Sequence, residues 1–318
     1  MNILITSVGR RTKLIEYFKN HFDKVVVTDA TNLAPAIYEA DKYYLAPSIK
    51  SDGYIEFLKD ICKKENIKGI LSLIDPELHL LSEYKEEFKN IGVFIIGSSK
   101  EVSEICFDKW KMYKFLKENE FRTAKTYIDI NKFKKELNEK KIGFPIFIKP
   151  ISGSASIGIS KVENIETLEL IWKLSKEKMM IQEFMSGKEI GVDVYTDTLT
   201  KEVVSIFTKE KINMRAGETD KAKSFKDKKL FDLIENFIKK LGTEGPVDID
   251  VFKVNGEYYI SEVNPRFGGG YPVAYESGEN FPVLIKNNLN NEKNEKNIGN
   301  YKENIIMLKC DDLKIVKS

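Results

Sequence analysis

The chain has 318 residues, of which 51 are basic and 49 are acidic, and 42% of its residues are hydrophobic. The resulting net charge of +2 gives no support for a nucleic-acid partner or an anionic membrane surface. No apolar run approaches the roughly 20 residues that a membrane-spanning helix needs. Residues 3–6 are typical of a buried strand rather than of an export signal, and the cysteines Cys62, Cys106 and Cys310 are far apart, as expected for reduced thiols. We expect a cytoplasmic protein of two or three compact units.

The first third of the chain alternates short apolar runs with segments of helical spacing, which predicts a small parallel α/β sheet. The apolar runs lie at residues 3–6, 25–28, 70–74 and 93–96. A dinucleotide-binding loop after the first run would need three spaced glycines, and only Gly9 is present. Arg10, at the same turn, is a candidate contact for a small anion. A solvated basic turn is the alternative.

Two carboxylates follow the apolar run at 70–74. Asp75 and Glu77 are predicted at the carboxyl edge of the sheet, where open α/β folds bind ligands, and are therefore candidate contacts for a substrate amine. The favoured alternative makes Asp75 the N-cap of a helix that begins near Pro76.

The second part of the chain carries two lysines and a loop of small residues. Lys109 begins a predicted helix, and Lys149 ends a β-branched and aromatic run just before a proline. The following loop contains Ser154, Ser156 and Gly158, whose backbone N–H groups and hydroxyls could surround a polyphosphate with little steric obstruction. An ordinary hairpin turn is the alternative. The loop lacks the lysine-serine ending of a Walker A motif, which argues against a P-loop.

The third part is predicted to be an antiparallel sheet with one amphipathic helix. Residues 189–196 and 202–208 alternate apolar and polar side chains, as strands of a half-buried sheet do. Arg215 follows in a segment poor in apolar residues, which predicts a loop. Residues 228–241 have helical spacing and are closed by Gly242.

A hairpin over residues 247–263 brings the acidic residues together. Asp248 and Asp250 share a face of the first strand, and Glu262 and Asn264 share a face of the second. The loop length decides whether the two pairs meet. A two-residue turn would set Glu262 on the face away from both aspartates.

We therefore predict a three-residue loop, 254–256, with Gly256 in the left-handed conformation, which pairs Asp248 with Glu262. Three carboxylates and an amide oxygen would then share one surface, and a hard cation such as Mg²⁺ would offset their repulsion. A solvated acidic hairpin is the alternative. The strand leaves this hairpin into Arg266 and a glycine run that includes Gly269, where backbone and one guanidinium can approach an anion closely.

The motif Glu262-Val263-Asn264-Pro265-Arg266 resembles the metal and phosphate motif of the ATP-grasp superfamily, in the subgroup of the carbamoyl phosphate synthetase large subunit. Three earlier motifs occur in the same order as in that superfamily: Asp108-Lys109, Lys149 with the following loop of small residues, and the segment 182–189. The resemblance covers residues 108–282. The resemblance implies a Rossmann-like α/β domain at 1–97 that precedes a two-lobed ATP-grasp domain with antiparallel sheets. The small lobe would span 98–185, and the large lobe, with the metal site and a C-terminal extension, would span 186–318.

The resemblance also implies a role for each motif residue. ATP phosphates would contact Lys109, Lys149 and the loop residues Ser154, Ser156 and Gly158. Adenine and ribose would contact Gln182, Glu183, Phe184, Met185 and Glu189. Mg²⁺, or Mn²⁺ in its place, would bind Asp250, Glu262 and Asn264. Aspartate at position 250 is shorter than the residue that many relatives have, so Asp248 is the alternative ligand. Arg215, Arg266 and Lys149 would be catalytic, and Arg10, Asp75, Glu77 and Gly269 would lie at the substrate end.

The implied reaction is that of a carboxylate–amine ligase: ATP phosphorylates a small carboxylate, and an amine attacks the acyl phosphate to form an amide. One alternative is a carbamoyl phosphate synthetase-like enzyme that acts on bicarbonate. A second is a nucleotide sensor or subunit that binds ATP without turnover. We also expect a possible homodimer, because family members are often dimers. Neither substrate follows from the sequence, since acceptor pockets are built from loops and from the first domain.

Overall fold

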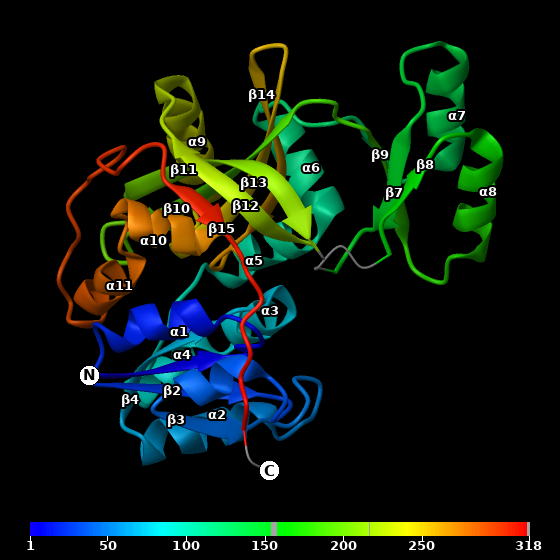
Figure 1. Ribbon diagram of the computed structural model, residues 1–318. Helices are drawn as coiled ribbons and strands as arrows, with labels where there is room; N and C mark the ends of the chain where they lie inside the picture. Colours follow the sequence, from blue (N-terminus) through cyan, green and yellow to red (C-terminus); the bar gives the residue numbers. More distant parts are fainter. Residues whose placement is uncertain (154–157, 216, 317–318) are drawn as a thin grey trace.

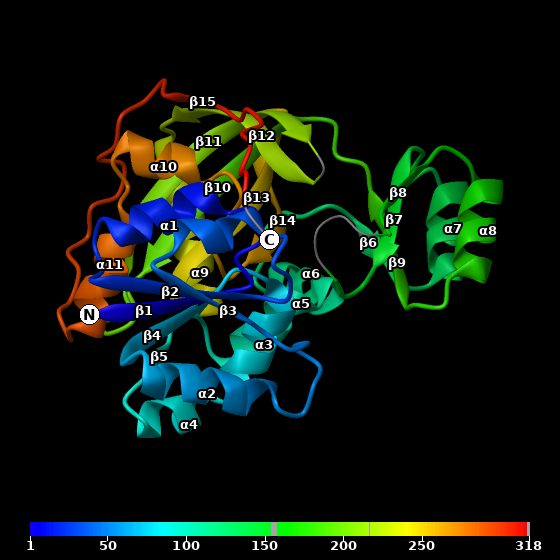
Figure 2. The same cartoon turned by 60° about the horizontal axis from the view of Figure 1, so that its bottom comes forward.

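The computed structural model describes residues 1–153, 158–215 and 217–316. Within these ranges the chain forms three sheets, which lie in separate parts of the molecule in both views (Figures 1 and 2). The predicted combination of a parallel amino-terminal sheet with antiparallel sheets in the rest of the chain is confirmed. Among the helices of the described ranges, none combines the length and the apolar character needed to cross a bilayer.

The first sheet is parallel and buried on both faces, which explains the continuous apolar runs of its inner strands. Its strands, in spatial order, are β3 (Lys42–Leu45), β2 (Lys24–Asp29), β1 (Asn2–Thr6), β4 (Ile67–Ser72) and β5 (Phe94–Ile95). The helical segments between them are α1 (Thr12–Lys19), η1 (Pro35–Glu39), α2 (Tyr54–Lys64), α3 (Asp75–Glu83) and α4 (Lys85–Asn90). Helices α2, α3 and α4 pack in a core on one face, whereas α1 packs on the other face with residues from the last third of the chain.

The second sheet is small and stands to the right in Figures 1 and 2, with its two helices on its outer side. Its strands, in spatial order, are β6 (Thr126–Tyr127), β9 (Met179–Glu183), β7 (Ile146–Pro150) and β8 (Ser160–Val162). The helices are α7 (Ile130–Asn138) and α8 (Ile165–Leu174). Together they bury a core of their own.

The third sheet is antiparallel. Its strands, in spatial order, are β14 (Glu257–Asn264), β13 (Gly245–Val254), β10 (Lys188–Thr196), β11 (Val203–Arg215), β12 (Glu218–Phe225) and β15 (Ile306–Leu308). Helix α9 (Lys228–Leu241) covers one face; Asp227 caps its first turn and Gly242, in the left-handed conformation, ends it. Helices α10 (Tyr271–Ser277) and α11 (Phe281–Leu289) join the core that α1 shares with this sheet.

Helices α5 (Lys100–Phe107) and α6 (Lys109–Glu118) pack differently from our expectation. Their buried side chains Val102, Met112 and Leu116 belong to the core beneath the third sheet and α9. The segment that begins at residue 98, which we assigned to the small lobe, therefore lies against the large lobe as far as Phe121. Figure 1 shows α6 beside β13 and β14, between the two lobes.

Candidate active site

The β13–β14 hairpin assembles the acidic residues, but by a different route from the predicted one. The turn is the two-residue Asn255-Gly256, with φ of 50° and 82°, and Val254 pairs with Glu257. The predicted three-residue loop is therefore wrong. A bulge lies between Asp250 and Val251, where Ser261 is an extra residue in β14. This extra residue shifts the strand pairing by one, so that Glu262 faces the same side of the sheet as the two aspartates.

Beyond this bulge, Asp250 pairs with Glu262 and Asp248 pairs with Asn264. The predicted partner of Asp248 was Glu262, so the pairing is shifted by two residues. The two acidic residues nearest the centre of the hairpin, Asp250 and Glu262, are now directly opposite each other.

These residues line a cavity of about 560 Å³ between the three sheets. The small lobe contributes Phe147, Lys149, Gln182, Glu183 and Met185, the first domain contributes Arg11 and Asp75, and the large lobe contributes Glu189, Lys211, Asp248, Asp250, Glu262, Asn264 and Arg266. Most of the residues proposed for ATP and metal thus face one space. Its volume is ordinary for a small-molecule site, which is about 300–1,000 Å³.

Two lysines meet at the small-lobe side of this cavity. Lys149, at the end of β7, is buried, and together with Lys109, Gln182 and Glu262 it lines a small adjoining cavity. Burial lowers the pKa of Lys149, and the nearby ammonium of Lys109 lowers it further, whereas Glu262 raises it. The Nζ atom of Lys109 donates to the carbonyl of Gly153, 2.5 Å away. An anion between the two ammonium groups would relieve their repulsion.

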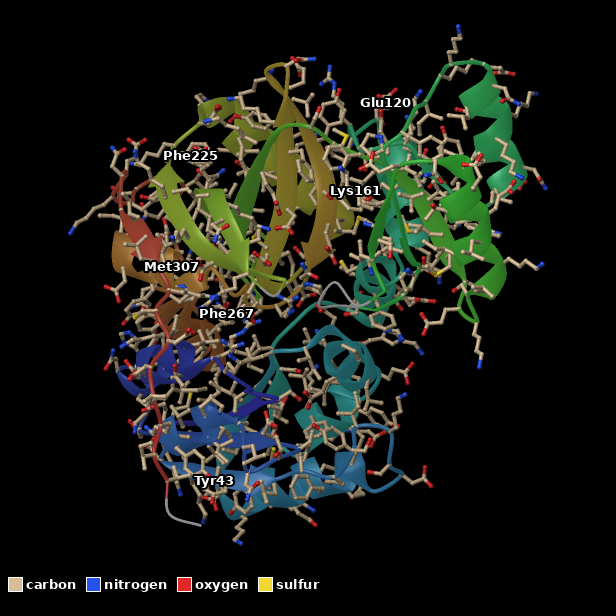
Figure 3. The ribbon with its side chains drawn as sticks, turned by 45° about the vertical axis from the view of Figure 1, so that its right-hand side comes forward. Tyr43, Glu120, Lys161, Phe225, Phe267 and Met307 are labelled. Atoms are coloured by element: carbon tan, nitrogen blue, oxygen red, sulfur yellow. The ribbon has the colours of Figure 1, made fainter. Side chains whose placement is uncertain are left out.

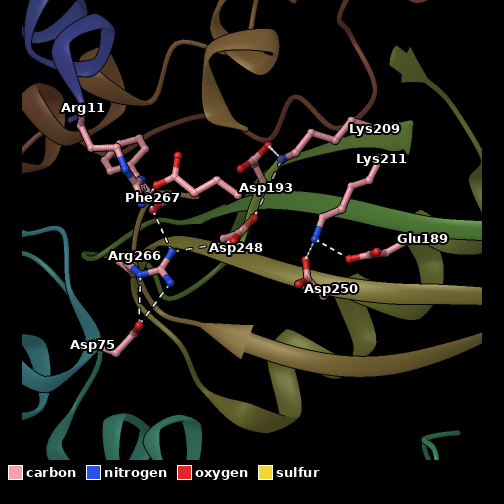
Figure 4. A network of polar contacts seen from close by, with 11 residues as sticks. Arg11, Asp75, Glu189, Asp193, Lys209, Lys211, Asp248, Asp250, Arg266 and Phe267 are labelled. Carbon is pink, nitrogen blue, oxygen red and sulfur yellow. Dashed lines mark hydrogen bonds and ion pairs between the residues drawn. The ribbon is translucent and has the colours of Figure 1, made fainter. Parts of the chain in front are cut away.

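Lys211 is a site residue that the sequence analysis did not identify. Its Nζ atom lies 2.5 Å from Oδ1 of Asp250 and 2.9 Å from Oε1 of Glu189, so it joins the expected metal ligand to the expected ribose contact (Figure 4). Burial raises the pKa of Asp250 to about 7, Asp248 and Glu262 add to the increase, and Lys211 opposes it. A second lysine two residues apart on β11, on the same face of the strand, was the only available signal.

Asp248 is engaged by other cations. Arg266 approaches it at 3.8 Å and Lys209 at 3.9 Å, and Lys209 also forms a buried ion pair with Asp193 (Figure 4). The aliphatic part of Lys209 fits only because positions 191 and 270 are glycines, since a Cβ atom at either would lie within 2.8 Å of its Cε. Lys209 was also missed, because nothing in the sequence distinguishes it from a surface lysine.

The oxygen atoms of the β13–β14 hairpin are suitable ligands for a magnesium ion. The predicted convergence of three carboxylates and an amide oxygen on one surface is confirmed, because Asp248, Asp250, Glu262 and Asn264 all line this cavity. The described residues nevertheless contain no cluster of three or more histidine, cysteine or acidic side chains in a metal-binding arrangement, and Asp248 contacts Arg266 and Lys209. Asp250, Glu262 and the amide oxygen of Asn264 remain as hard oxygen donors at one cavity.

The first domain holds Arg266 from below (Figure 4). Oδ2 of Asp75 accepts from Nε and Nη2 of Arg266 at 3.3 and 3.2 Å. Asp75 makes no N-cap hydrogen bond, and the N-cap position of α3 is Ile74, so the N-cap interpretation is wrong. Arg11, the neighbour of the predicted Arg10, donates to the carbonyl of Phe267 at 3.2 Å. Figure 3 shows Phe267 at the junction of the two domains.

The other proposed substrate contacts, Glu77, Gly269 and Arg10, lie in three different places. Glu77 is fully buried inside the first domain, where its carboxylate accepts from the hydroxyls of Ser7, Ser72 and Tyr54. Its hydrogen-bonding capacity is used by these groups, and it lines neither large cavity. Gly269 lines both large cavities, and the exposed Arg10 lines the outer one.

Arg215 lies in a strand rather than in a loop. It ends β11, pairs with Glu218 across the turn, and forms ion pairs with Asp220 and Asp311 at 3.1 and 3.0 Å. It lines the outer cavity, so the structure does not bring it together with Lys149 and Arg266. The outer cavity occupies about 610 Å³ beside α1 and α10.

The segment proposed for adenine begins with the last two residues of β9, Gln182 and Glu183. Glu183 exchanges hydrogen bonds with the backbone of Lys125, and Gln182 donates to Thr126 at 3.2 Å. Phe184 packs on Phe147, with ring centroids 5.5 Å apart. These contacts fix the strand end whose backbone would face the base. Gly158 has a φ of 74°, whereas Ser154 and Ser156 lie outside the described residues.

Comparison with known proteins agrees with this geometry. The ATP-grasp domain family matches residues 106–270, and a family described as the PylC-like N-terminal domain matches residues 3–96. The arginine-specific carbamoyl phosphate synthase large chain of Bacillus subtilis is 23% identical over 268 residues, which cover 80% of this chain and 25% of that protein. This chain therefore spans about a quarter of that relative's length.

One further relative and one solved structure match a larger share of their own length. The D-alanine–D-alanine ligase B of Clostridium tetani is 27% identical over 252 residues, covering 68% of this chain and 69% of the ligase. The biotin carboxylase domain of Hydrogenobacter thermophilus 2-oxoglutarate carboxylase, solved as a dimer with MgADP, ADP and bicarbonate, has a TM-score of 0.74 at 16% identity. That alignment covers 96% of this chain and 73% of the solved chain, and at such identity it shows a shared fold.

The expected resemblance to the ATP-grasp superfamily, with carbamoyl phosphate synthase among the relatives, is confirmed. Because the ATP-grasp match extends over more than half of the 318 residues, the chain belongs to the ATP-grasp family.

Proposed function

We propose that this chain is an ATP-dependent carboxylate–amine ligase. The observation that carries the proposal is the convergence on one cavity of a buried lysine, Lys149, the paired carboxylates Asp250 and Glu262, and the anchored guanidinium of Arg266. Positive groups on two sides of a polyphosphate, with hard oxygen donors between them, are what phosphoryl transfer requires of a protein.

In the proposed reaction a carboxylate oxygen attacks the γ-phosphorus of ATP, the bond to the β-phosphate oxygen breaks, and ADP leaves. An amine nitrogen then attacks the acyl carbon, inorganic phosphate leaves with the bonding electrons, and the nitrogen loses a proton to solvent. Lys109 and Lys149 would bind the ATP phosphates. Arg266 would hold the transferred phosphoryl group, and Asp75 would keep its guanidinium oriented.

Asp250, Glu262 and Asn264 would hold Mg²⁺, with Mn²⁺ as a substitute. When bound, the ion would neutralise charge on the phosphate oxygens. Asp250 is the favoured carboxylate over Asp248, because it lies directly opposite Glu262 in the hairpin, whereas Asp248 lies opposite Asn264. Glu189 would accept from the ribose hydroxyls, with Gln182, Glu183 and Met185 around the base.

The test is ADP release by the purified protein with Mg²⁺, ATP and panels of small carboxylates and amines. We expect ADP release that needs one carboxylate, and we expect Lys149→Ala and Glu262→Ala to abolish it without unfolding the protein. Near-normal turnover in either folded variant would overturn the site assignment. Bicarbonate belongs in the panel, because release with bicarbonate alone would favour a carbamoyl phosphate synthetase-like reaction. Mg²⁺-dependent ATP binding without any turnover would favour a sensor.

Two further proposals concern the setting of the enzyme. A cytoplasmic location is supported by Cys62, Cys106 and Cys310, which are all free thiols. A homodimer is supported by the biotin carboxylase domain of Hydrogenobacter thermophilus, which shares this fold and was solved as a dimer. Sedimentation of the purified protein at micromolar concentration tests the second proposal.

A further inference from the structure

The outer cavity adjoins the proposed ATP cavity. It lies between α1, α10 and residues 305–314, and it shares Arg11, Glu218 and Gly269 with the inner cavity. A ligand in the outer cavity could therefore place one end beside Arg266 and the metal-site hairpin. Its volume of about 610 Å³ is enough for a compound several times larger than bicarbonate.

The charged side chains around this cavity mostly neutralise one another. The ion pairs are Lys13–Glu16 at 2.6 Å, Arg215–Asp311 at 3.0 Å, Lys309–Glu218 at 3.0 Å and Lys314–Glu39 at 2.6 Å. These pairs leave little free charge along the wall, so the wall has no strong preference for a charged ligand body.

The inner end of the cavity is different, because two guanidinium groups meet there. Nη1 of Arg11 and Nη1 of Arg266 both donate to the carbonyl of Phe267, at 3.2 and 3.0 Å. Glu218 forms an ion pair with Arg11 at 3.6 Å, which is too long for a hydrogen bond. Burial lowers the pKa of Arg11, and the charge of Arg266 lowers it further. A ligand carboxylate would give Arg11 a two-oxygen partner, which none of the residues that the structure describes supplies.

The rest of the wall is rich in apolar side chains. Leu14, Tyr17 and Val273 come from the helices, and Ile306 and Leu308 come from β15. Ile306 and Leu308 are two residues apart and therefore share one face of the strand. Their side chains are 55% and 66% exposed. Exposed apolar side chains that gather at a cavity are typical of a binding site.

We propose that the outer cavity binds the carboxylate substrate, and that this substrate is a carboxylic acid with a bulky apolar body. The carboxylate lies on Arg11, next to Arg266, and the apolar body lies along α1 and β15. This inference rests on the proposed ligase function and narrows its substrate class.

Hydroxylamine provides a test that does not require the natural amine, since it converts an acyl phosphate into a hydroxamate. ADP and hydroxamate are measured with Mg²⁺, ATP, hydroxylamine and one carboxylate at a time. The apolar panel is 4-methylpentanoate, 3-phenylpropionate, L-leucine and L-phenylalanine, and the polar panel of similar size is succinate, L-glutamate and L-lysine. We expect kcat/KM for the best apolar acid to exceed that for every polar acid by at least about tenfold.

The three outcomes are distinct. Preference for apolar acids supports the inference. Preference for polar acids overturns the inference but upholds the ligase function. If no carboxylate, bicarbonate included, stimulates ADP release while calorimetry shows Mg²⁺-dependent ATP binding, both the ligase function and the inference are wrong.

Variants of two apolar residues locate the site. Leu308→Glu places a charge in the wall of the cavity, and we expect it to raise KM for the best apolar acid by about tenfold or more, with KM for ATP changed much less. The matched control is Ile212→Glu, because Ile212 is 54% exposed on the same sheet but lines neither cavity. Equal effects of the two substitutions would overturn the assignment of the site.

Discussion

At the scale of single residues, Lys211 has the largest stabilising effect on the charge of Asp250 in the proposed metal site. Asp250 has a raised pKa because it is buried near Asp248 and Glu262, and Lys211 is the cation that opposes this shift. The attraction of Asp250 and Glu189 in turn raises the pKa of Lys211 despite its burial. In this structure Lys211 provides positive charge that a bound Mg²⁺ would also provide.

We predict that Lys211→Met destabilises the protein in the absence of Mg²⁺ by about 1–3 kcal/mol, because it leaves the buried carboxylate of Asp250 without its hydrogen-bond donor. The same variant should show a larger increase in melting temperature on addition of Mg²⁺ than the wild type does, since the cation no longer competes with an ammonium group. Thermal unfolding with and without Mg²⁺ measures both effects.

Lys188→Met is the control for that measurement. Lys188 lies on the same sheet and pairs with Glu210 at 3.1 Å, but both side chains are exposed, so its loss should change stability by at most about 1 kcal/mol. If Lys211→Met showed no greater response to Mg²⁺ than this control, Lys211 would not lie at the cation site.

At the scale of elements, the glycine run after β14 is fitted to the ion pairs around it. A Cβ atom at position 268 would lie 2.3 Å from Oδ1 of Asp248, whereas a Cβ atom at position 269 would lie no closer than 3.3 Å to Glu218. Gly268 therefore sets the place of the carboxylate that contacts both Arg266 and Lys209.

We predict that Gly268→Ala lowers the free energy of unfolding by about 1–3 kcal/mol and strongly reduces carboxylate-dependent ADP release, because Asp248 must move and Arg266 loses a partner. Gly269→Ala should be milder in its effect on stability, since the Glu218 carboxyl can shift slightly. Chemical denaturation compares the two variants. An equal loss of stability in both would contradict the packing argument.

The same region shows which features the sequence could predict. Asp248 and Asp250 share one face of β13, and Glu262 and Asn264 share one face of β14, as the two-residue period of a strand predicts. The pairing between the strands does not, because it depends on the bulge at Ser261, and a serine in a strand carries no signature of a bulge. The N-cap role of Asp75 was favoured from the neighbouring residues alone, whereas its partner Arg266 is 191 residues away in the sequence. Rules that use only neighbouring residues cannot predict such a long-range contact.

At the scale of the whole molecule, the first domain and the large lobe share a hydrophobic core, whereas the small lobe has a core of its own among the described residues. One core joins the first domain to the large lobe, through Phe18 of α1 and Phe267 and Tyr271 beyond β14. Their rings pack edge to face, 5.8 Å apart for Phe18 and Phe267 and 4.6 Å apart for Phe267 and Tyr271. The small lobe instead buries its own core around Phe133 and Ile148.

We therefore expect the small lobe to open independently, with the first domain and the large lobe unfolding as one unit. In hydrogen exchange without nucleotide, amides of β7 and β9 should exchange faster than those of β1, β10 and β13. Addition of Mg²⁺ and ATP should protect β7 and β9 most, because Lys149 and the strand end at Glu183 would then be joined through the ligand to Asp250 and Glu262 on the large lobe. Lys149→Ala should lose most of this protection. Uniform protection of all three sheets, or none in the small lobe, would contradict a nucleotide site between the lobes.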